Sequence, residues 1–351
     1  MIKVLVVDDS SFMRASISHI LSSDKEIEVA GTAVDGVDAL KKVGEIRPDV
    51  VILDIDMPVM DGLTALSYIM AKYQTPVVML SGLAEKDARI AIKSLERGAV
   101  DFIPKPSGLI SYDIDTIRDE IISKVKIAAF VNVQKMGIVP ILPGGTGKMP
   151  VPPMTKKEIV VIGASTGGPR ALETVLAGIP HGVSAAIIVV QHMSPLFIPS
   201  FAERLHWESA LDISVARDGE AVMPGKVLVA PGDCNTIIEQ DLEGRKITVL
   251  RGFDDSALRI PKSAMVQSID HTMEAAAHAY GERTLGVLLT GVGSDGAIGM
   301  KAIKDAGGRT IAEDESTCIV YGMPKAAIEM GVVDEVVPLH GIAEAIMRMV
   351  C

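Results

Sequence analysis

The sequence predicts an α/β fold made of two doubly wound domains, and three observations support this fold class. Short runs rich in valine, isoleucine and leucine alternate with segments of helical periodicity along most of the chain. Several of these runs end in acidic or glycine-rich turns, which is typical of the carboxyl ends of parallel strands. A stretch dense in proline and glycine interrupts the alternation and breaks both helices and strands. We therefore expect one domain at residues 1–130, a linker at 131–157 and a second domain at 158–351.

In the first domain, each apolar run precedes a helical pattern. The expected strands are residues 3–7, 27–32, 49–53, 76–80 and 101–104, and the expected helices are 11–21, 38–46, 63–70, 87–95 and 114–129. Strands and helices that alternate in this way form a parallel sheet with helices on both faces. The residues that follow the strands should therefore meet along one edge of the sheet.

Polar residues occupy the carboxyl ends of these strands. They are Asp8 and Asp9 after the first strand, Asp54 after the third, Ser81 after the fourth and Lys105 after the fifth. Each one could be an ordinary solvated turn residue. Three carboxylates in one crevice, however, repel each other strongly unless a hard divalent cation neutralises them. A magnesium site with one carboxylate left to accept a phosphoryl group accounts for all of these residues.

Residues 2–129 resemble the receiver domain of bacterial and archaeal response regulators, which has a flavodoxin-like fold. The motifs that carry the resemblance are V-D-D-S, L-D-I-D-M-P-V-M-D-G, M-L-S-G and D-F-I-P-K-P. The resemblance implies that Asp54 is the phosphoacceptor. It also implies that Asp8, Asp9, Asp54 and the backbone carbonyl of Asp56 hold Mg²⁺.

The same resemblance implies roles for residues on the last two strands of this domain. Ser81 and Lys105 would contact the phosphoryl oxygens, and Phe102 would be the aromatic residue that changes position on phosphorylation. The phosphodonor would be a histidine kinase.

The second domain continues the alternation of strands and helices. The expected strands are residues 158–163, 184–190, 212–216, 226–230 and 285–290. One expected helix begins at residue 169, and the other expected helices span residues 195–207, 265–280 and 297–306. Residues 236–240 and 247–250 alternate across a short polar turn, which predicts an antiparallel hairpin. Further short units extend to residue 340. We expect a mostly parallel sheet with one antiparallel hairpin.

The stretch E-I-V-V-I-G-A-S-T-G-G-P-R at residues 158–170 places Ser165 on a turn between a buried strand and a helix that starts at Pro169. Three interpretations compete for this turn: a nucleophilic serine, a glycine-rich dinucleotide site and an ordinary glycine-rich connection. A dinucleotide site needs an acid at the end of the next strand. That strand ends in Gln191 and His192 instead, which favours the nucleophile.

A catalytic serine and histidine need an acid that orients the imidazole. Asp295 follows a third strand and glycine-rich turn, L-L-T-G-V-G-S-D-G. His192 and Asp295 could each merely cap a helix. Because three such strand ends carry serine, histidine and aspartate, a catalytic triad is the better interpretation. The chain order differs from that of α/β-hydrolases, which implies a separate lineage.

Nearly the whole chain resembles the chemotaxis protein-glutamate methylesterases. The motifs are I-G-A-S-T-G-G-P, V-V-Q-H-M, S-F-A-E-R-L, V-A-P-G, L-L-T-G-V-G-S-D-G-A and Y-G-M-P-K-A-A. The resemblance implies that Ser165 is the nucleophile, His192 the general base and then acid, and Asp295 the orienting carboxylate. The backbone N–H groups of Thr166 and Val292 would stabilise the oxyanion.

Two departures from the family pattern occur near this site. The family usually has methionine where Val292 stands, which could widen the oxyanion side without removing a backbone donor. Where the family commonly reads P-S-V-D, this chain has Gln267, Ser268, Ile269 and Asp270.

The function implied is phosphorylation-activated hydrolysis of glutamate γ-methyl esters on the cytoplasmic helices of methyl-accepting chemoreceptors, together with deamidation of glutamines there. The receiver would need Mg²⁺ and the esterase domain no cofactor. The rival interpretations are a signalling module that binds a partner without catalysis and a DNA-binding regulator. Intact Ser165, His192 and Asp295 argue against the first. A net charge of −11 disfavours nucleic acid as a partner.

Composition also bears on where the protein works. No apolar run approaches the length of a membrane span, and the N-terminus enters a strand pattern without a signal peptide. We therefore expect a cytoplasmic protein without membrane insertion. The cysteines, Cys234, Cys318 and Cys351, are odd in number and widely spaced, which predicts reduced thiols and no disulfide or zinc site.

Overall fold

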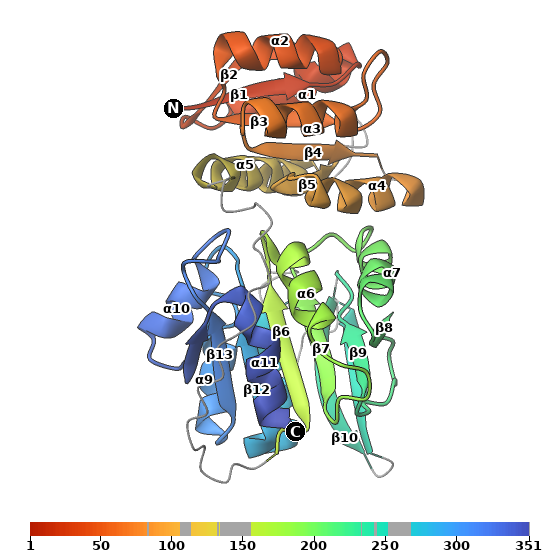
Figure 1. The fold of residues 1–351 in the computed structure, drawn as a ribbon, viewed down its shortest axis with the longest axis vertical. Coiled ribbons are helices and arrows are strands. Elements are labelled where there is room, and N and C mark those ends of the chain that lie inside the picture. Colours follow the sequence, from red (N-terminus) through yellow and green to blue (C-terminus); the bar gives the residue numbers. More distant parts are fainter. Residues whose placement is uncertain are drawn as a thin grey trace. The chain divides into compact units, whose positions relative to one another are not determined.

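The structure is a computed structural model that describes residues 1–82, 84–105, 114–131, 133, 156–232, 234–241, 244–251 and 268–350. Most of the expected linker at 131–157, and Gln267 in the second domain, lie outside the described residues. The chain divides into two compact units, Met1–Ile138 and Val139–Cys351 (Figure 1).

The first unit contains a five-stranded parallel sheet with the strand order β2-β1-β3-β4-β5. The strands are β1 (Ile2–Val7), β2 (Ile27–Ala33), β3 (Val50–Asp54), β4 (Val77–Ser81) and β5 (Asp101–Pro104). The helices are α1 (Ser11–Ser22), α2 (Gly36–Ile46), α3 (Gly62–Lys72), α4 (Glu85–Glu96) and α5 (Ile114–Phe130). The predicted fold class of this unit is confirmed.

Local sequence explains where the helices of this unit begin. Ser10, Asp35 and Asp61 each precede a helix, and each side chain accepts a hydrogen bond from a backbone N–H of the first turn. All the side chains of β3 and β4 are buried, because α1 packs with α5 and α2 packs with α3 around the sheet. The polar residues that follow the strands are therefore left at one edge.

The second unit contains a seven-stranded parallel sheet with the order β14-β13-β12-β6-β7-β9-β8. The strands are β6 (Ile159–Ala164), β7 (Ala186–Gln191), β8 (Asp212–Val215), β9 (Lys226–Val229), β12 (Thr284–Leu288), β13 (Arg309–Glu313) and β14 (Glu335–Val337). The helices are α6 (Gly168–Ala177), α7 (Ile198–Glu208), α8 (Ile269–Tyr280), α9 (Ala297–Asp305), α10 (Met323–Glu329) and α11 (Leu339–Val350), with a short 3-10 turn, η2 (Gly281–Arg283), after α8.

The expected antiparallel hairpin is confirmed as β10 (Cys234–Asp241) and β11 (Gly244–Arg251), which form a separate two-stranded sheet. The hairpin packs on α8, and Ile238 and Ile247 join the core cluster that contains Ile159, Val161 and Met273. On the other face of the large sheet, α6 packs with α7 and α11. Successive residues of β6 thus face two different helix layers, which explains its unbroken apolar run.

Three helices differ from the sequence prediction. Helix α7 begins at Ile198 and not at 195, because the N–H of Phe197 donates to the carbonyl of Ser194 and forms a turn first. Helix α8 is described from Ile269, while 265–267 lie outside the described residues. The prediction of short units up to 340 missed α11 (Leu339–Val350), whose buried residues recur at helical spacing.

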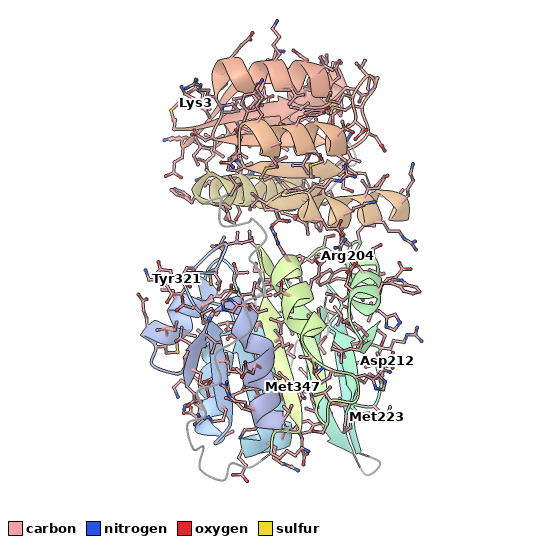
Figure 2. The ribbon with its side chains drawn as sticks, viewed as in Figure 1. Lys3, Arg204, Asp212, Met223, Tyr321 and Met347 are labelled. Atoms are coloured by element: carbon pink, nitrogen blue, oxygen red, sulfur yellow. The ribbon has the colours of Figure 1, made fainter. Side chains whose placement is uncertain are left out.

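The strand order creates a switch point in each sheet. In the first unit β1 leads to β2 on one side, and β2 then leads to β3 on the other side of β1. In the second unit β6 leads to β7 on one side, while β12, on the other side of β6, leads to β13. Ligands of such sheets bind outside the carboxyl ends of the strands at the switch point. In Figure 2, Arg204 and Tyr321 lie toward that end of the second unit, and Met223 and Met347 toward the other.

Replacement of Phe201 by alanine should destabilise the second unit by about 3–5 kcal/mol, because its ring on α7 is fully buried and a cavity would remain. Urea unfolding followed by circular dichroism would measure the change. Trp207→Ala on the same helix is the control: its side chain is 77% exposed, and its loss should cost less than about 0.5 kcal/mol. Equal losses for the two variants would contradict the assignment of this core.

Candidate active site

Ser165 lies on the turn between β6 and α6, as the sequence predicts. Its N–H donates to the carbonyl of Thr290 at 3.0 Å, and its carbonyl accepts from the N–H of Gly168 at 2.8 Å. Gly167 has φ of 78°, in the left-handed region that favours glycine. Pro169 lies in the first turn of α6. The turn leaves Ser165 half-buried at the carboxyl end of β6.

The turn after β12 approaches the serine turn closely. A Cβ atom added at Gly291 would lie 2.8 Å from the Cβ of Ser165 and 2.2 Å from the sulfur of Met323. These separations are too short for any side chain at this position. Glycine at 291 therefore permits the contact between the two turns at the switch point.

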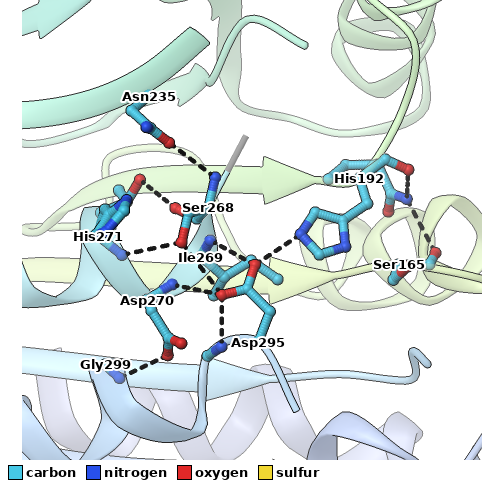
Figure 3. Close-up of polar contacts among 12 residues, drawn as sticks. Ser165, His192, Asn235, Ser268, Ile269, Asp270, His271, Asp295 and Gly299 are labelled. Atoms are coloured by element: carbon cyan, nitrogen blue, oxygen red, sulfur yellow. Dashed lines mark hydrogen bonds and ion pairs between the residues drawn. The ribbon is translucent and has the colours of Figure 1, made fainter. Parts of the chain in front are cut away.

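His192 follows β7, the neighbour of β6, and its N–H donates to the carbonyl of Ala164 at 3.0 Å. Its Nε2 lies 2.8 Å from Oδ2 of Asp295 (Figure 3). Because an ionised carboxylate only accepts hydrogen bonds, Nε2 carries the proton and Nδ1 is an acceptor in the neutral ring. Among the described residues, no hydrogen bond joins Ser165 to His192, and Figure 3 shows the imidazole between Asp295 and Ser165.

Asp295 is held by donors from the start of α8. Its carboxylate accepts from the N–H of Ile269 at 2.9 Å, from the N–H of Asp270 at 3.0 Å and from the hydroxyl of Ser268 at 3.3 Å. Burial by itself would raise the pKa of Asp295, but His192 and these backbone amides lower it to about 2. The carboxylate is therefore ionised at neutral pH, as a residue that orients an imidazole must be.

Asp270 is a second carboxyl group beside Asp295. It accepts from the N–H of Gly299 at 2.7 Å. Burial, and then the negative charge of Asp295, raise its pKa to about 6. The two neighbouring carboxyl groups therefore lose their protons at different pH values. Asp295, which contacts His192, keeps its negative charge at neutral pH.

The sequence prediction missed three residues that support this site. Ser268 is the N-cap of α8, and its N–H donates to the side-chain oxygen of Asn235 at 3.0 Å. Glu313 is buried and accepts from the N–H of Thr290, whose carbonyl in turn receives the N–H of Ser165. Burial raises the pKa of Glu313 to about 7. A serine directly before a helical pattern is an N-cap signal, but the partners of Asn235 and Glu313 are not encoded locally.

The first unit brings its predicted acidic residues together. Ligand atoms of Asp8, Asp9 and Asp54 lie within 4.8 Å of one another. The amine of Lys105 lies 2.7 Å from Oδ1 of Asp54 and 3.0 Å from Oδ2 of Asp8. Burial raises the pKa of Asp54 to about 6, although Lys105 acts in the opposite direction. Oδ2 of Asp54 is buried and has no hydrogen-bond partner among the described residues, which fits a carboxylate oxygen that binds a cation.

The other predicted residues of this unit differ in exposure. Ser81 is buried at the end of β4, and its hydroxyl donates to the carbonyl of Gly82 at 3.2 Å. Phe102 is buried, and the amine of Lys124 lies 5.5 Å from the centre of its ring. The side chain of Asp56, just after β3, is exposed. Oδ1 of Asp8 accepts from the N–H of Ser10 at 2.9 Å.

In the part of the chain that the structure describes, no helix is both long enough and apolar enough to cross a membrane.

Comparisons with known proteins give one consistent result. A model of the CheB methylesterase family matches residues 160–346, and a model of the response regulator receiver domain matches residues 4–111. A protein from Syntrophomonas wolfei named protein-glutamate methylesterase/protein-glutamine glutaminase 1 is 44% identical over 99% of both chains. A protein-glutamate methylesterase/protein-glutamine glutaminase from Pyrococcus abyssi is 46% identical over 99% of this chain and 94% of its own length.

The solved structures include a similar catalytic domain. The crystal structure of the Thermotoga maritima CheB methylesterase catalytic domain is 40% identical and has a TM-score of 0.51. The match covers 55% of this chain and 99% of that one.

Replacement of Asp295 by asparagine should destabilise the protein by about 2 kcal/mol at pH 7. The folded pKa of about 2 is below the unfolded value, so the stabilisation is complete above that unfolded value, about 4, and disappears as the pH falls toward 2. Urea unfolding of both proteins between pH 7 and pH 3 would measure the difference. Asp305→Asn, an exposed carboxylate on α9, is the control. If the difference in free energy of unfolding between the wild type and Asp295→Asn stayed constant with pH, the low pKa of Asp295 would be contradicted.

Proposed function

This chain belongs to the CheB methylesterase family, and we propose that Ser165, His192 and Asp295 carry out its hydrolysis of glutamate γ-methyl esters. The hydrolase activity belongs to the second unit, and the receiver domain brings it under phosphorylation control in chemotaxis. The observation that carries the proposal is the 2.8 Å contact between His192 and an ionised Asp295, beside a serine at the switch point of the sheet.

The reaction begins with nucleophilic attack by the serine. Nδ1 of His192 takes the proton of the Ser165 hydroxyl as Oγ forms a bond to the ester carbonyl carbon. The protonated imidazole, stabilised by Asp295, then gives its proton to the methoxy oxygen, and the carbon–oxygen bond breaks to release methanol. Water attacks the acyl-enzyme with His192 again as base, and the glutamate carboxylate and free Ser165 are restored.

The same chemistry serves glutamine side chains. Ammonia replaces methanol as the leaving group, and the product is again a glutamate carboxylate. The names of both relatives include a protein-glutamine glutaminase activity, which supports this second reaction. We infer that one serine carries out both.

The tetrahedral intermediates carry a negative charge on the former carbonyl oxygen. We assign the backbone N–H groups of Thr166 and Val292 as its donors. Both residues lie in turns at the switch point, next to Ser165 and Gly291 respectively, and the two turns are in van der Waals contact. A valine in place of the family's methionine at 292 leaves the backbone donor unchanged.

A signalling module that only binds a partner is the alternative. Such a module would not need an ionised, partly buried carboxylate bound to an imidazole, because that arrangement costs desolvation energy. The hydrogen bonds that Asp295 receives from His192, Ile269, Asp270, Ser268 and Gly296 favour catalysis.

In the first unit, we propose Asp54 as the phosphoacceptor, with Mg²⁺ held by Asp8, Asp9, Asp54 and the carbonyl of Asp56. The bound cation would neutralise the carboxylates and the phosphoryl oxygens. Lys105, already 2.7 Å from Asp54, would pair with a phosphoryl oxygen.

Changes at two residues would follow phosphorylation of Asp54. The hydroxyl of Ser81 would turn from the carbonyl of Gly82 to the phosphoryl group, and Phe102 would change its rotamer, which alters the surface around β5. The partners we propose are a chemotaxis histidine kinase as phosphodonor and methyl-accepting chemoreceptors as substrate.

Ser165→Ala should lower the rate of methanol release from receptors with labelled methyl esters by about 10⁴-fold to 10⁶-fold, because the nucleophile is lost. Ser209→Ala, which removes a serine at the end of α7, is the control and should retain wild-type activity. Circular dichroism would verify that both variants are folded. Activity of Ser165→Ala within tenfold of the wild-type rate would refute the triad.

Asp54→Asn should keep the basal esterase rate but lose its increase on addition of a small phosphodonor and Mg²⁺. Asp24→Asn is the matched control, because this aspartate of the same unit pairs with Lys126 away from the acidic cluster. Methanol release with and without phosphodonor would be measured for the wild type and both variants. If Asp54→Asn still responded to the phosphodonor, another residue would have to be the phosphoacceptor.

A further inference from the structure

The carbonyl of Ser165 accepts two hydrogen bonds. One comes from the N–H of Gly168, at 2.8 Å, and closes the serine turn. The other comes from the side-chain Nε2 of Gln191, the last residue of the neighbouring strand β7, at 2.9 Å. The position of this carbonyl oxygen is thus fixed from two directions.

That carbonyl belongs to the same peptide unit as the N–H of Thr166. In a trans peptide the C=O and N–H lie in one plane and point in opposite directions, so fixing the oxygen also fixes the direction of the N–H. Thr166 is only 7% exposed, yet among the described residues no protein group accepts its N–H. This N–H is therefore a backbone donor that a ligand could use.

The second assigned oxyanion donor has the same construction. The carbonyl of Gly291, which shares its peptide unit with the N–H of Val292, accepts from the N–H groups of Gly322 at 3.1 Å and Met323 at 2.9 Å. These two donors are the first backbone amides of α10. The orientation of this peptide thus depends on backbone donors, whereas that of the Ser165 peptide depends partly on the side chain of Gln191.

The side chain of Gln191 can adopt only one orientation here. Its Nε2 also donates to the carbonyl of His192 at 3.0 Å, and since both partners are carbonyl oxygens, the NH₂ end must face them. The residue is 2% exposed, and its Oε1 is buried with no hydrogen-bond partner in the part of the chain that the structure describes. A Cβ atom at Gly168 would lie 2.1 Å from this oxygen. Glycine at 168 therefore leaves the room that the amide occupies.

We propose that Gln191 is a positioning residue that directs the N–H of Thr166 at the oxyanion. This inference rests on the proposed function and deepens it. Hydrogen bonds to the carbonyl oxygen of a peptide also polarise the unit, which makes its N–H a stronger donor. Gln191 touches no reacting atom; it acts through the Ser165–Thr166 peptide.

The test compares kcat, KM and the affinity for a small alkylboronic acid in the wild type and in Gln191→Leu. A boronate bound to Oγ of Ser165 places one oxygen where the oxyanion forms, so its affinity reports on the donors there. Removal of an oxyanion donor costs about 10² to 10³ in kcat, and a donor that is only misdirected should cost less, about 10-fold to 100-fold. The expected result is an equal loss in kcat and in boronate affinity, with KM unchanged.

Thr310→Val is the matched control. Thr310 on β13 is fully buried and its hydroxyl donates to the carbonyl of Val332 at 2.7 Å, so this variant also loses a buried side-chain bond to a backbone carbonyl in the same unit. It should lose stability but keep kcat and boronate affinity. If Gln191→Leu did not fold, Gln191→Asn would replace it, since its shorter amide cannot reach the carbonyls of both Ser165 and His192.

Two outcomes would overturn the proposal. The first is an unchanged kcat in a folded Gln191 variant. The second is a lower kcat with unchanged boronate affinity and a shifted acidic limb of the pH profile, which would assign the effect to His192. The Ser165→Ala variant distinguishes these outcomes from failure of the proposed function. If that variant still bound the boronate or hydrolysed the ester, the triad would be refuted, whatever the role of Gln191.

Discussion

The carboxylate of Asp295 at the amino end of α8 is the interaction on which the rest of the second unit's site depends. A partly buried charge needs hydrogen-bond donors around it, and here the donors are the first amides of the helix, the hydroxyl of Ser268 and the ring of His192. The positive end of the helix dipole adds to this stabilisation. One carboxylate thereby links the start of α8 to the imidazole that follows β7.

Close backbone contacts make this link possible. A Cβ atom at Gly163, the fifth residue of β6, would lie 2.4 Å from the side chain of Ile269, so α8 can begin against β6 only because a glycine is there. Gly291 has the same function for the contact between the turns after β12 and β6. The glycines of the serine motif and of the aspartate motif thus serve packing between elements as well as local turn geometry.

Aspartates at strand ends behave oppositely in the two units. Asp54 is buried beside Asp8 with one oxygen unpaired, and its pKa is raised to about 6. Asp295 is only partly buried and accepts hydrogen bonds from several N–H groups, and its pKa is lowered to about 2. The same edge of the same kind of sheet therefore holds a carboxyl group with a raised pKa in one unit and a carboxylate with a lowered pKa in the other.

The amino-acid sequence by itself determined the fold class, most helix and strand positions, and the strand ends that carry Ser165, His192 and Asp295, because periodicity and glycine-rich turns are local signals. Only the tertiary structure decided that β12 pairs with β6, so that Asp295 reaches His192. It also decided that Gln191 crosses to the carbonyl of Ser165. Strand order and side-chain partners depend on which distant segments bury their surfaces together, and no local pattern of residues encodes that choice.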